Sequence, residues 1–255
     1  MSDASASDAK TGEPIRFYGR RKGKPLKATR LHLLDTLLPQ LAIPKPAGPI
    51  APAALFAHAP ERVWLEVGFG GGEHLADQAT AHPDVGFIGS EVFLNGIGGV
   101  LKGIDAGKLT NVRIFPEDVR FLMPALPTAS LERIYVMFPD PWPKSRHAKR
   151  RFIGPANLPE LSRLLRDGGE LRVASDHPIY VRWCLQHVPV HPDFAWAVTG
   201  PDDWRQRPAD GFPTRYEQKA IAAGRPPHYL RFVRKARALP HCGGGAAQTA
   251  SACLD

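Results

Sequence analysis

The chain has 255 residues, 43% of them hydrophobic, which is enough to bury a sizeable core. Its polar start has no apolar core of the kind found in signal peptides, and no run approaches the ~18 apolar residues of a membrane span. The three cysteines lack CxxC spacing, which argues against a disulfide framework or a zinc site. The net charge of +8 fits either a polyanionic partner or a generally basic surface, and the composition predicts a cytoplasmic protein without a membrane partner.

The segment before the main domain has two parts. Residues 1–30 combine a polar start, expected to be disordered, with a basic arm, RFYGRRKGKPLKATR (16–30), that carries seven Lys or Arg residues. Residues 31–60 contain LHLLDTLLPQL, a candidate for a short helix, and a proline-rich connector. The main domain is expected at 61–236, followed by a glycine- and alanine-rich flexible tail at 237–255.

Within the main domain, strands and helices are expected to alternate. Short apolar runs predict strands at 62–68, 85–92, 111–115, 131–138, 170–175, 194–199 and 228–235. Helices are expected at 73–81, 93–106, 119–125, 156–166 and 178–187. The helix at 156–166 is followed by glycine, which is a typical C-cap signal. The alternation predicts an α/β fold with a mostly parallel sheet, in which ligands bind at the carboxyl ends of the strands.

The first strand runs into a glycine-rich loop, LEVGFGGGEHL. With Gly68 and Gly70 in it, such a loop lets the backbone approach a ligand closely, although an ordinary strand–helix turn has the same composition. Glu66 is an acid inside an apolar strand, and burying it is costly without a polar partner. A cationic or amine-bearing ligand above the loop would supply that partner.

Two further acids follow the next two strands. Glu91 ends the second strand, where a carboxylate can accept hydrogen bonds from a ribose diol or simply remain solvated. Asp118 follows the third strand and is suited either to contact an adenine amino group or to cap the next helix. Together with the glycine loop, these acids fit a dehydrogenase or a methyltransferase.

The segment IYVMFPDPWPKSRHAKRRFI (134–153) distinguishes these two classes. Three prolines constrain the loop so that Asp140 and Trp142 project from the end of the fourth strand. An acid beside an aromatic ring can hold a flat heterocycle by its edge and its face. Six basic residues follow within the eight positions 144–151, and they are suited to hold the phosphates that carry such a base.

Several motifs resemble the bacterial tRNA (guanine-N7)-methyltransferase family: LEVGFGGG, the Glu91 strand end, FPDPWPKSRHAKRR, ASD (174–176) and TRYEQKA. The resemblance covers roughly residues 60–235 and the basic arm. It implies a Rossmann-like class I methyltransferase fold, with a mostly parallel central sheet flanked by helices. It also implies S-adenosylmethionine as cofactor and tRNA as partner, methylated at N7 of guanine 46 in the variable loop, with no obligate protein partner.

The resemblance also implies roles for individual residues. Cofactor contacts are expected at Glu66, Gly68, Gly70, Glu91, Asp118 and Asp140, and contacts to guanine or tRNA at Lys144, Asp176, Thr214, Arg215, Tyr216 and Glu217. Asp176 is also a candidate N-cap for the helix that begins near Pro178. Guanine N7 attacks with its own lone pair, so Asp140 is expected to act as a catalytic residue by stabilising charge rather than as a base.

The sequence departs from the family pattern at two places. HPIY follows Asp176 where relatives often carry a bulkier acidic and aromatic segment, and Pro143 replaces a histidine of some relatives. The histidines show no metal-ligand spacing, so no metal is assigned. A small-molecule methyltransferase would not need the cations after Asp140, and a tRNA-binding protein without activity would not need Glu66, the glycine loop and Glu91 together.

Overall fold

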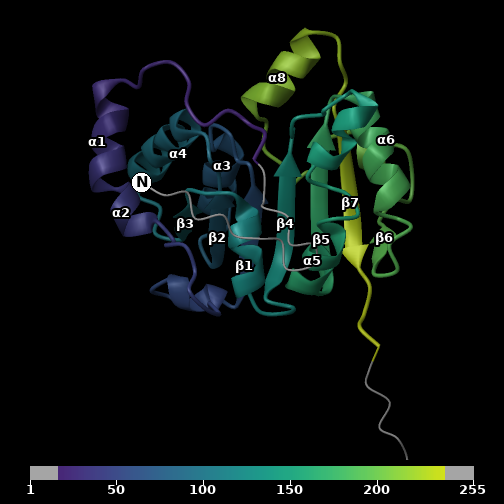
Figure 1. Cartoon of the computed structure of the whole chain (residues 1–255), viewed down its shortest axis with the longest axis horizontal. Helices are drawn as coiled ribbons and strands as arrows, with labels where there is room; N and C mark the ends of the chain where they lie inside the picture. The colour runs from purple at the N-terminus through teal and green to yellow at the C-terminus, as the bar shows by residue number, and fades with distance from the viewer. Residues whose placement is uncertain (1–16, 239–255) are drawn as a thin grey trace, which may run out of the picture.

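A computed structural model of the chain describes residues 17–238 (Figure 1). The start expected to be disordered, apart from the basic arm, and nearly all of the expected tail lie outside the described residues. Arg237, the first residue of that tail, is described: it pairs with Asp167 and donates to the backbone carbonyls of Arg163 and Leu165.

The described residues form a seven-stranded sheet with helices on both of its faces (Figure 1). The strands are β1 (Arg62–Val67), β2 (Val85–Ser90), β3 (Val112–Phe115), β4 (Leu131–Met137), β5 (Leu165–Ser175), β6 (Phe194–Trp196) and β7 (His228–Arg234). They lie in the order β3-β2-β1-β4-β5-β7-β6; the first five in this spatial order are parallel, and β7 is antiparallel to β5 and β6. Because the strand order reverses between β1 and β4, a ligand site is expected at their carboxyl ends.

The helices cover the two faces of the sheet separately. They are α1 (Ala28–Thr36), α2 (Leu38–Leu41), α3 (Glu73–Ala81), α4 (Leu94–Gly107), α5 (Leu158–Leu164), α6 (Pro178–His187), α7 (Asp202–Arg205) and α8 (Arg215–Ala222), with short 3₁₀ turns η1 (Pro52–Leu55), η2 (Val119–Phe121), η3 (Met123–Ala125) and η4 (Ser145–Arg150). No helix in residues 17–238 combines the length and apolarity required to cross a bilayer.

The core consists of two layers of side chains, one on each face of the sheet. Neighbouring residues of β1 point to opposite faces: Trp64 belongs to the same core cluster as Leu75 of α3, and Leu65 to the cluster that contains Leu161 of α5 and Tyr180 of α6. Both faces of the central strands are therefore buried, as the continuous apolar runs predict. The parallel strands consequently expose their functional side chains only at their ends.

Two of the expected helices differ from the structure. The helix expected at 156–166 ends at Leu164, and the glycines that follow lie within β5, so the C-cap prediction is wrong. Leu165 pairs with Leu131 of β4, and this sheet pairing replaces the cap. The helix expected at 119–125 is instead two 3₁₀ turns, η2 and η3, because Pro124 has no backbone N–H to donate.

Candidate active site

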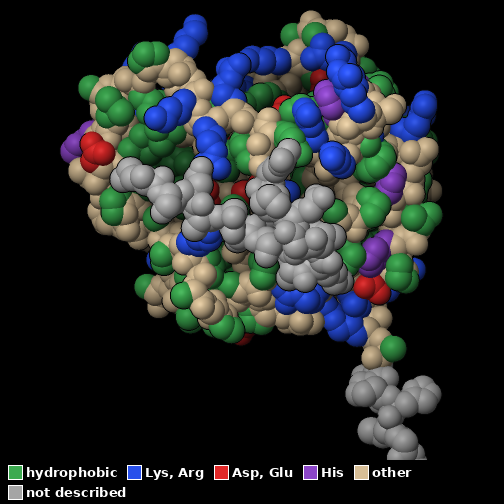
Figure 2. Space-filling view, viewed as in Figure 1, with side chains coloured by type: hydrophobic (Ala, Val, Ile, Leu, Met, Phe, Trp, Pro, Cys, Tyr) green, Lys and Arg blue, Asp and Glu red, His purple; other side chains and the backbone are tan. Residues whose placement is uncertain are grey.

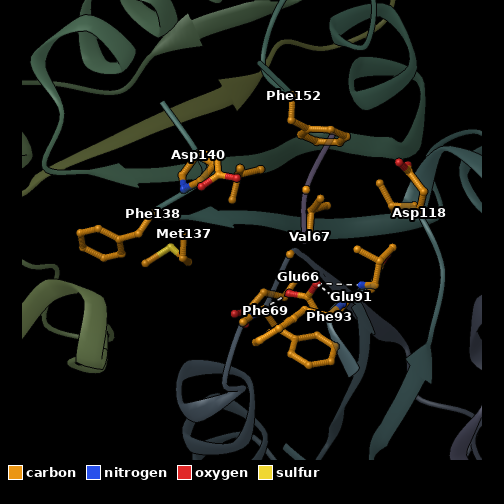
Figure 3. A pocket seen from close by; sticks show the side chains of 18 of the residues that line it. Glu66, Val67, Phe69, Glu91, Phe93, Asp118, Met137, Phe138, Asp140 and Phe152 are labelled. Atoms are coloured by element: carbon orange, nitrogen blue, oxygen red, sulfur yellow. Dashed lines mark hydrogen bonds between the residues drawn. The ribbon is translucent and has the colours of Figure 1, made fainter. Parts of the chain in front are cut away.

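The carboxyl ends of β1, β2, β3 and β4 surround a cleft of about 590 Å³ (Figure 3). Its floor is the loop after β1, where Gly68 has a φ of 67° and Gly72, which begins α3, has a φ of 77°. These left-handed values favour glycine. A Cβ atom at Gly68 would meet nothing within 4 Å, so the space beside this backbone is open. A Cβ at Gly72 would lie 2.3 Å from a carbon of Val100, so α3 and α4 could not pack as closely with a side chain there.

Glu91 joins the end of β2 to this loop. Its carboxylate accepts hydrogen bonds from the backbone N–H groups of Gly70 (2.8 Å), Val92 (2.7 Å) and Phe93 (2.9 Å). Burial raises the pKa of Glu91, and the nearby charge of Asp140 acts in the same direction. Glu91 thus fixes the loop and lines the cleft at the position where a ribose diol is expected.

Glu66 has a polar partner within the protein. Its side chain is only 3% exposed, and its Oε2 lies 2.8 Å from Nδ1 of His74 on α3, which is 2% exposed. The prediction that Glu66 needs a polar partner is confirmed. The partner is the His74 side chain, whereas the sequence suggested a ligand. Glu66 also lines the cleft, beside Glu91 in Figure 3.

Asp118, at the end of β3, caps the turn that follows it. Its carboxylate accepts from the backbone N–H of Arg120 (3.0 Å) and pairs with the Arg120 guanidinium (2.9 and 2.7 Å). The capping alternative is therefore confirmed. An adenine contact stays a prediction, consistent with the position of Asp118 at the side wall of the cleft (Figure 3).

Asp140 lies across the cleft from Glu66 and Glu91 (Figure 3). The proline-rich loop that carries it has left-handed backbone at Phe138 (φ 49°) and Trp142 (φ 42°). Asp140 itself is exposed and belongs to the lining of the cleft. The loop thus turns sharply on both sides of an acid that remains accessible.

A buried arginine anchors this loop. Arg151 is 8% exposed and donates to the backbone carbonyls of Pro141 (3.1 Å) and Trp142 (2.9 Å). Its guanidinium also lies over the ring of Trp183 on α6, 4.6 Å from the centroid. Arg151 is therefore a structural member of the basic run rather than a free cation.

The remaining cations of the run divide according to the 3₁₀ period of η4. Side chains three positions apart share one side of such a turn. Arg146 and Lys149 are both exposed, whereas His147 and Arg150 are partly buried. His147 meets the edge of the Trp142 ring, and Arg150 lies 4.8 Å from its centroid. With Lys144, which is also exposed, the run presents three cations to solvent.

The described part of the basic arm lies along the cleft. The rings of Tyr18 and Trp142 contact each other edge to face, with centroids 6.2 Å apart, and the Arg150 guanidinium lies over both, 4.5 Å from the Tyr18 centroid. Backbone contacts fix the arm further on: the N–H of Leu94 donates to the carbonyl of Arg21, and Asn95 bonds both Gly23 and Lys24. The arm therefore forms part of the cleft wall in this structure.

The TRYE segment divides into structural and accessible residues. Thr214 and Glu217 form a capping box at the start of α8, and both are buried, although Thr214 also lines the cleft. Glu217 also accepts from the Tyr229 hydroxyl (2.6 Å). By contrast, Tyr216 is 45% exposed and lines the cleft next to Gly70. Arg215 pairs with Glu73 (3.0 Å) at the start of α3.

Asp176 follows β5 but does not cap α6. The N-cap is His177, whose ring nitrogen accepts from the N–H of Ile179, so the capping alternative for Asp176 is wrong. Asp176 instead pairs with Arg225 (2.8 Å) and is not among the residues that line the cleft. Lys144 is likewise outside the cleft lining.

Sequence reasoning did not find His74, Arg225 or the anchoring role of Arg151. His74 occupies the second position of α3, a helix that begins in the glycine loop. This position was the only sequence feature that could have indicated a role in the site. The pairing of Arg225 with Asp176 spans 49 positions and has no local signal. No group of His, Cys, Asp and Glu suited to hold a metal occurs among residues 17–238.

Charged side chains of both signs surround the site. Among the described residues, six carboxylates line the cleft, together with Arg20, Arg120, Lys149, Arg150 and Arg151. Figure 2 shows further Lys and Arg side chains gathered along the upper side of the molecule, the side toward which β4 points. The carboxylates at the strand ends suit a cationic ligand, and the exposed cations suit a polyanion. Carboxylates at the strand ends and exposed cations beyond Asp140 are thus both present around one cleft.

The chain is similar to known methyltransferases. A family model described as "Putative methyltransferase" matches residues 60–230. A "tRNA (guanine-N(7)-)-methyltransferase" of Rhodospirillum rubrum is 58% identical over 234 residues, which cover 90% of this chain and 91% of that protein. Proteins with the same name from Paramagnetospirillum magneticum (55% identical, 88% and 95% covered) and Ruegeria sp. (47% identical, 91% and 93% covered) are also similar.

Proposed function

Because the chain belongs to the tRNA (guanine-N7)-methyltransferase family, we propose that it transfers a methyl group from S-adenosylmethionine to N7 of a guanine in tRNA. The fold is that of a class I S-adenosylmethionine-dependent methyltransferase, with its mostly parallel, seven-stranded sheet. The observation that carries the proposal is the position of Asp140. It lies between a glycine-floored cleft, with carboxylates at the surrounding strand ends, and a row of exposed cations. As a target nucleotide we propose guanine 46 of the variable loop, and we place the reaction in the cytoplasm without an obligate protein partner.

The residues of the cleft fit this cofactor. S-adenosylmethionine carries a sulfonium and an ammonium group, a ribose diol and an adenine. Carboxylates from three strand ends, Glu66, Glu91 and Asp118, line the cleft, and the open space beside Gly68 admits a ligand against the backbone. Gly68 and Gly70 would thus make the floor, while Glu66, Glu91 and Asp118 would hold the polar groups of the cofactor.

The bound cofactor supplies an electrophilic methyl group. The chain's own residues hold the guanine in line with it and stabilise the positive charge that the purine acquires. Asp140 accepts a hydrogen bond from a guanine N–H and offsets that charge, and it removes no proton from N7. Tyr216 presents an exposed ring at the edge of the cleft, where a base can stack.

The remaining family positions act from the rim. Lys144 is proposed to hold a tRNA phosphate, and Asp176 and Arg215 to contact the nucleotide from the neighbouring loops. Thr214 and Glu217 contribute differently, since both are buried in the capping box of α8. They hold Arg215 and Tyr216 in position. Thr214 also lines the cleft, so a substrate contact from it remains part of the proposal.

Methyl transfer from labelled S-adenosylmethionine to unmodified tRNA, followed by nucleoside analysis, tests the proposed function. We expect the label in N7-methylguanosine and its loss when guanine 46 is replaced in the transcript. Label in another nucleoside would contradict the proposed reaction. Label that persists after the replacement would contradict only the proposed position.

Glu91→Ala is expected to weaken binding of S-adenosylmethionine by roughly tenfold or more, because three backbone N–H groups lose a charged acceptor and the glycine loop loses its anchor. Glu91→Gln, which keeps one acceptor oxygen, should lie between the variant and the parent. Calorimetry measures both affinities. The affinity for tRNA serves as the control and should stay close to that of the parent. Unchanged cofactor affinity in Glu91→Ala would reject the assignment.

A further inference from the structure

A chain of buried polar groups extends from the cleft into the protein, and the proposed reaction does not account for it. His74 contacts Glu66 through Nδ1, and its Nε2 lies 3.4 Å from Nε2 of Gln78, one helical turn later. The same Gln78 amide donates to the backbone carbonyl of Asp210 (2.8 Å). His74 and Gln78 are 2% and 0% exposed, so the chain is shielded from solvent.

The partners determine the direction of these hydrogen bonds. An amide nitrogen only donates, so Nε2 of His74 accepts from Gln78. The ring hydrogen of a neutral histidine is then on Nδ1, from which it is donated to Glu66. The described residues offer no second donor to the Glu66 carboxylate, whose side chain also lines the cleft. One carboxylate oxygen is thus fixed from behind, and the other is free to meet a ligand.

The far end of the chain is also fixed. The Asp210 carboxylate is held by Arg172 (2.7 and 2.8 Å) and by Arg133 (3.2 Å). Asp210 lines a second cavity of about 510 Å³ beneath the loop that leads to α8, and His74 lies in the wall between the two cavities. A histidine that served only to fill the core would need neither a directed bond to Glu66 nor a position in this wall.

We propose that His74 is a positioning residue for cofactor binding: by donating from Nδ1 it holds the Glu66 carboxylate in the orientation that receives a cationic or N–H group of S-adenosylmethionine. Gln78 and Asp210 fix the histidine from the opposite side. The inference rests on the proposed function in one respect, since it takes S-adenosylmethionine as the ligand of the cleft.

The test compares His74→Ala with His74→Asn. Asparagine can place its amide nitrogen near the position of Nδ1 and so retain the donor. His74→Ala is expected to weaken S-adenosylmethionine binding in calorimetry by roughly tenfold, with a matching rise in KM, while kcat and the affinity for tRNA stay near the parent values. His74→Asn should restore most of the affinity.

Asn111→Ala is the matched control. Asn111 is as buried as Glu66 and donates to three backbone carbonyls that end α3 and begin β2, away from the cleft. Both alanine variants should lower the melting temperature, but only His74→Ala should lower cofactor affinity. In a Glu66→Gln background, His74→Ala should have little further effect on that affinity, because the acceptor has already changed.

Three outcomes would overturn the inference. If His74→Ala bound the cofactor as tightly as the parent, His74 would have only a packing role. An equal loss of affinity in Asn111→Ala would attribute the effect to stability, and His74→Asn that binds no better than His74→Ala would deny the donor role. Absence of binding in the parent is a separate result, which would contradict the proposed function itself and the inference with it.

Discussion

Asp140→Ala is expected to lower the rate of methyl transfer by at least about 100-fold, the scale associated with loss of one preorganised electrostatic interaction in a transition state. The protein should remain folded, because Asp140 is exposed and the anchor of its loop, Arg151, binds the carbonyls of the next two residues rather than the acid. Single-turnover measurement at saturating cofactor and tRNA isolates the chemical step from binding.

The chemistry predicts a graded series at this position. Asp140→Asn keeps an acceptor for the guanine N–H but loses the charge that offsets the methylated purine, so its rate should lie between those of the parent and Asp140→Ala. A general base would behave differently, since asparagine would then be as inactive as alanine. Asp105→Ala, which removes an exposed acid paired with Lys108 at the end of α4, is the matched control and should not change the rate. Near-parental turnover in Asp140→Ala would remove Asp140 from the catalytic role.

The sequence predicted the centre of the sheet well because the central strands are buried on both faces. Continuous apolar runs indicated all seven strands, although β6 is shorter and β5 longer than expected. The helices α3 and α6 also match their expected positions. The errors arose where tertiary pairing overrides a local signal. The glycines after α5 lie within β5, and a glycine that ends a helix has the same local sequence as one inside a strand.

For the candidate site, the positions of backbone features could be predicted and the partners of side chains could not. Glycines, prolines and strand ends are local, so they indicated the loops that surround the cleft. The partners of Glu66 and Asp176 lie 8 and 49 positions away, and only the fold brings them together. Thr214 and Glu217 are an exception, because they pair with each other three positions apart and their spacing is the local signature of a capping box.

The basic residues that follow Asp140 have different roles in the structure. As a run they predicted a single phosphate-binding patch. The structure instead separates them into three groups: the anchor Arg151, Arg150 whose guanidinium lies over the rings of Tyr18 and Trp142, and a row that faces solvent. Removing Arg150 would disturb the rings of Tyr18 and Trp142 and hence the cleft wall. A test of tRNA binding should therefore leave Arg150 and Arg151 intact.

Changing Lys144, Arg146 and Lys149 together to alanine is expected to weaken tRNA binding by at least about tenfold at physiological salt, because a phosphate that no longer meets a cation no longer releases its counterion. The dependence of affinity on salt should flatten by a slope of roughly one for each phosphate that is no longer bound. Cofactor affinity should stay near that of the parent, since Lys144 and Arg146 lie outside the cleft lining and Lys149 is exposed at its border. A double variant, Lys144→Ala with Arg146→Ala, keeps Lys149. Equal cofactor affinity in the double and triple variants would show that Lys149 does not affect cofactor binding.

The matched control removes three exposed cations elsewhere, Lys102, Lys108 and Arg166, so that the net charge of both variants is the same. If general charge attracts tRNA, the two triple variants should lose affinity equally and their salt slopes should change alike. If the row after Asp140 holds the phosphates next to the reacting base, only the first variant should lose affinity and slope. Parental affinity and slope in that variant would show that the row is merely solvated, and the basic arm along the cleft, with Arg21 and Lys24, would then be the expected tRNA-binding segment.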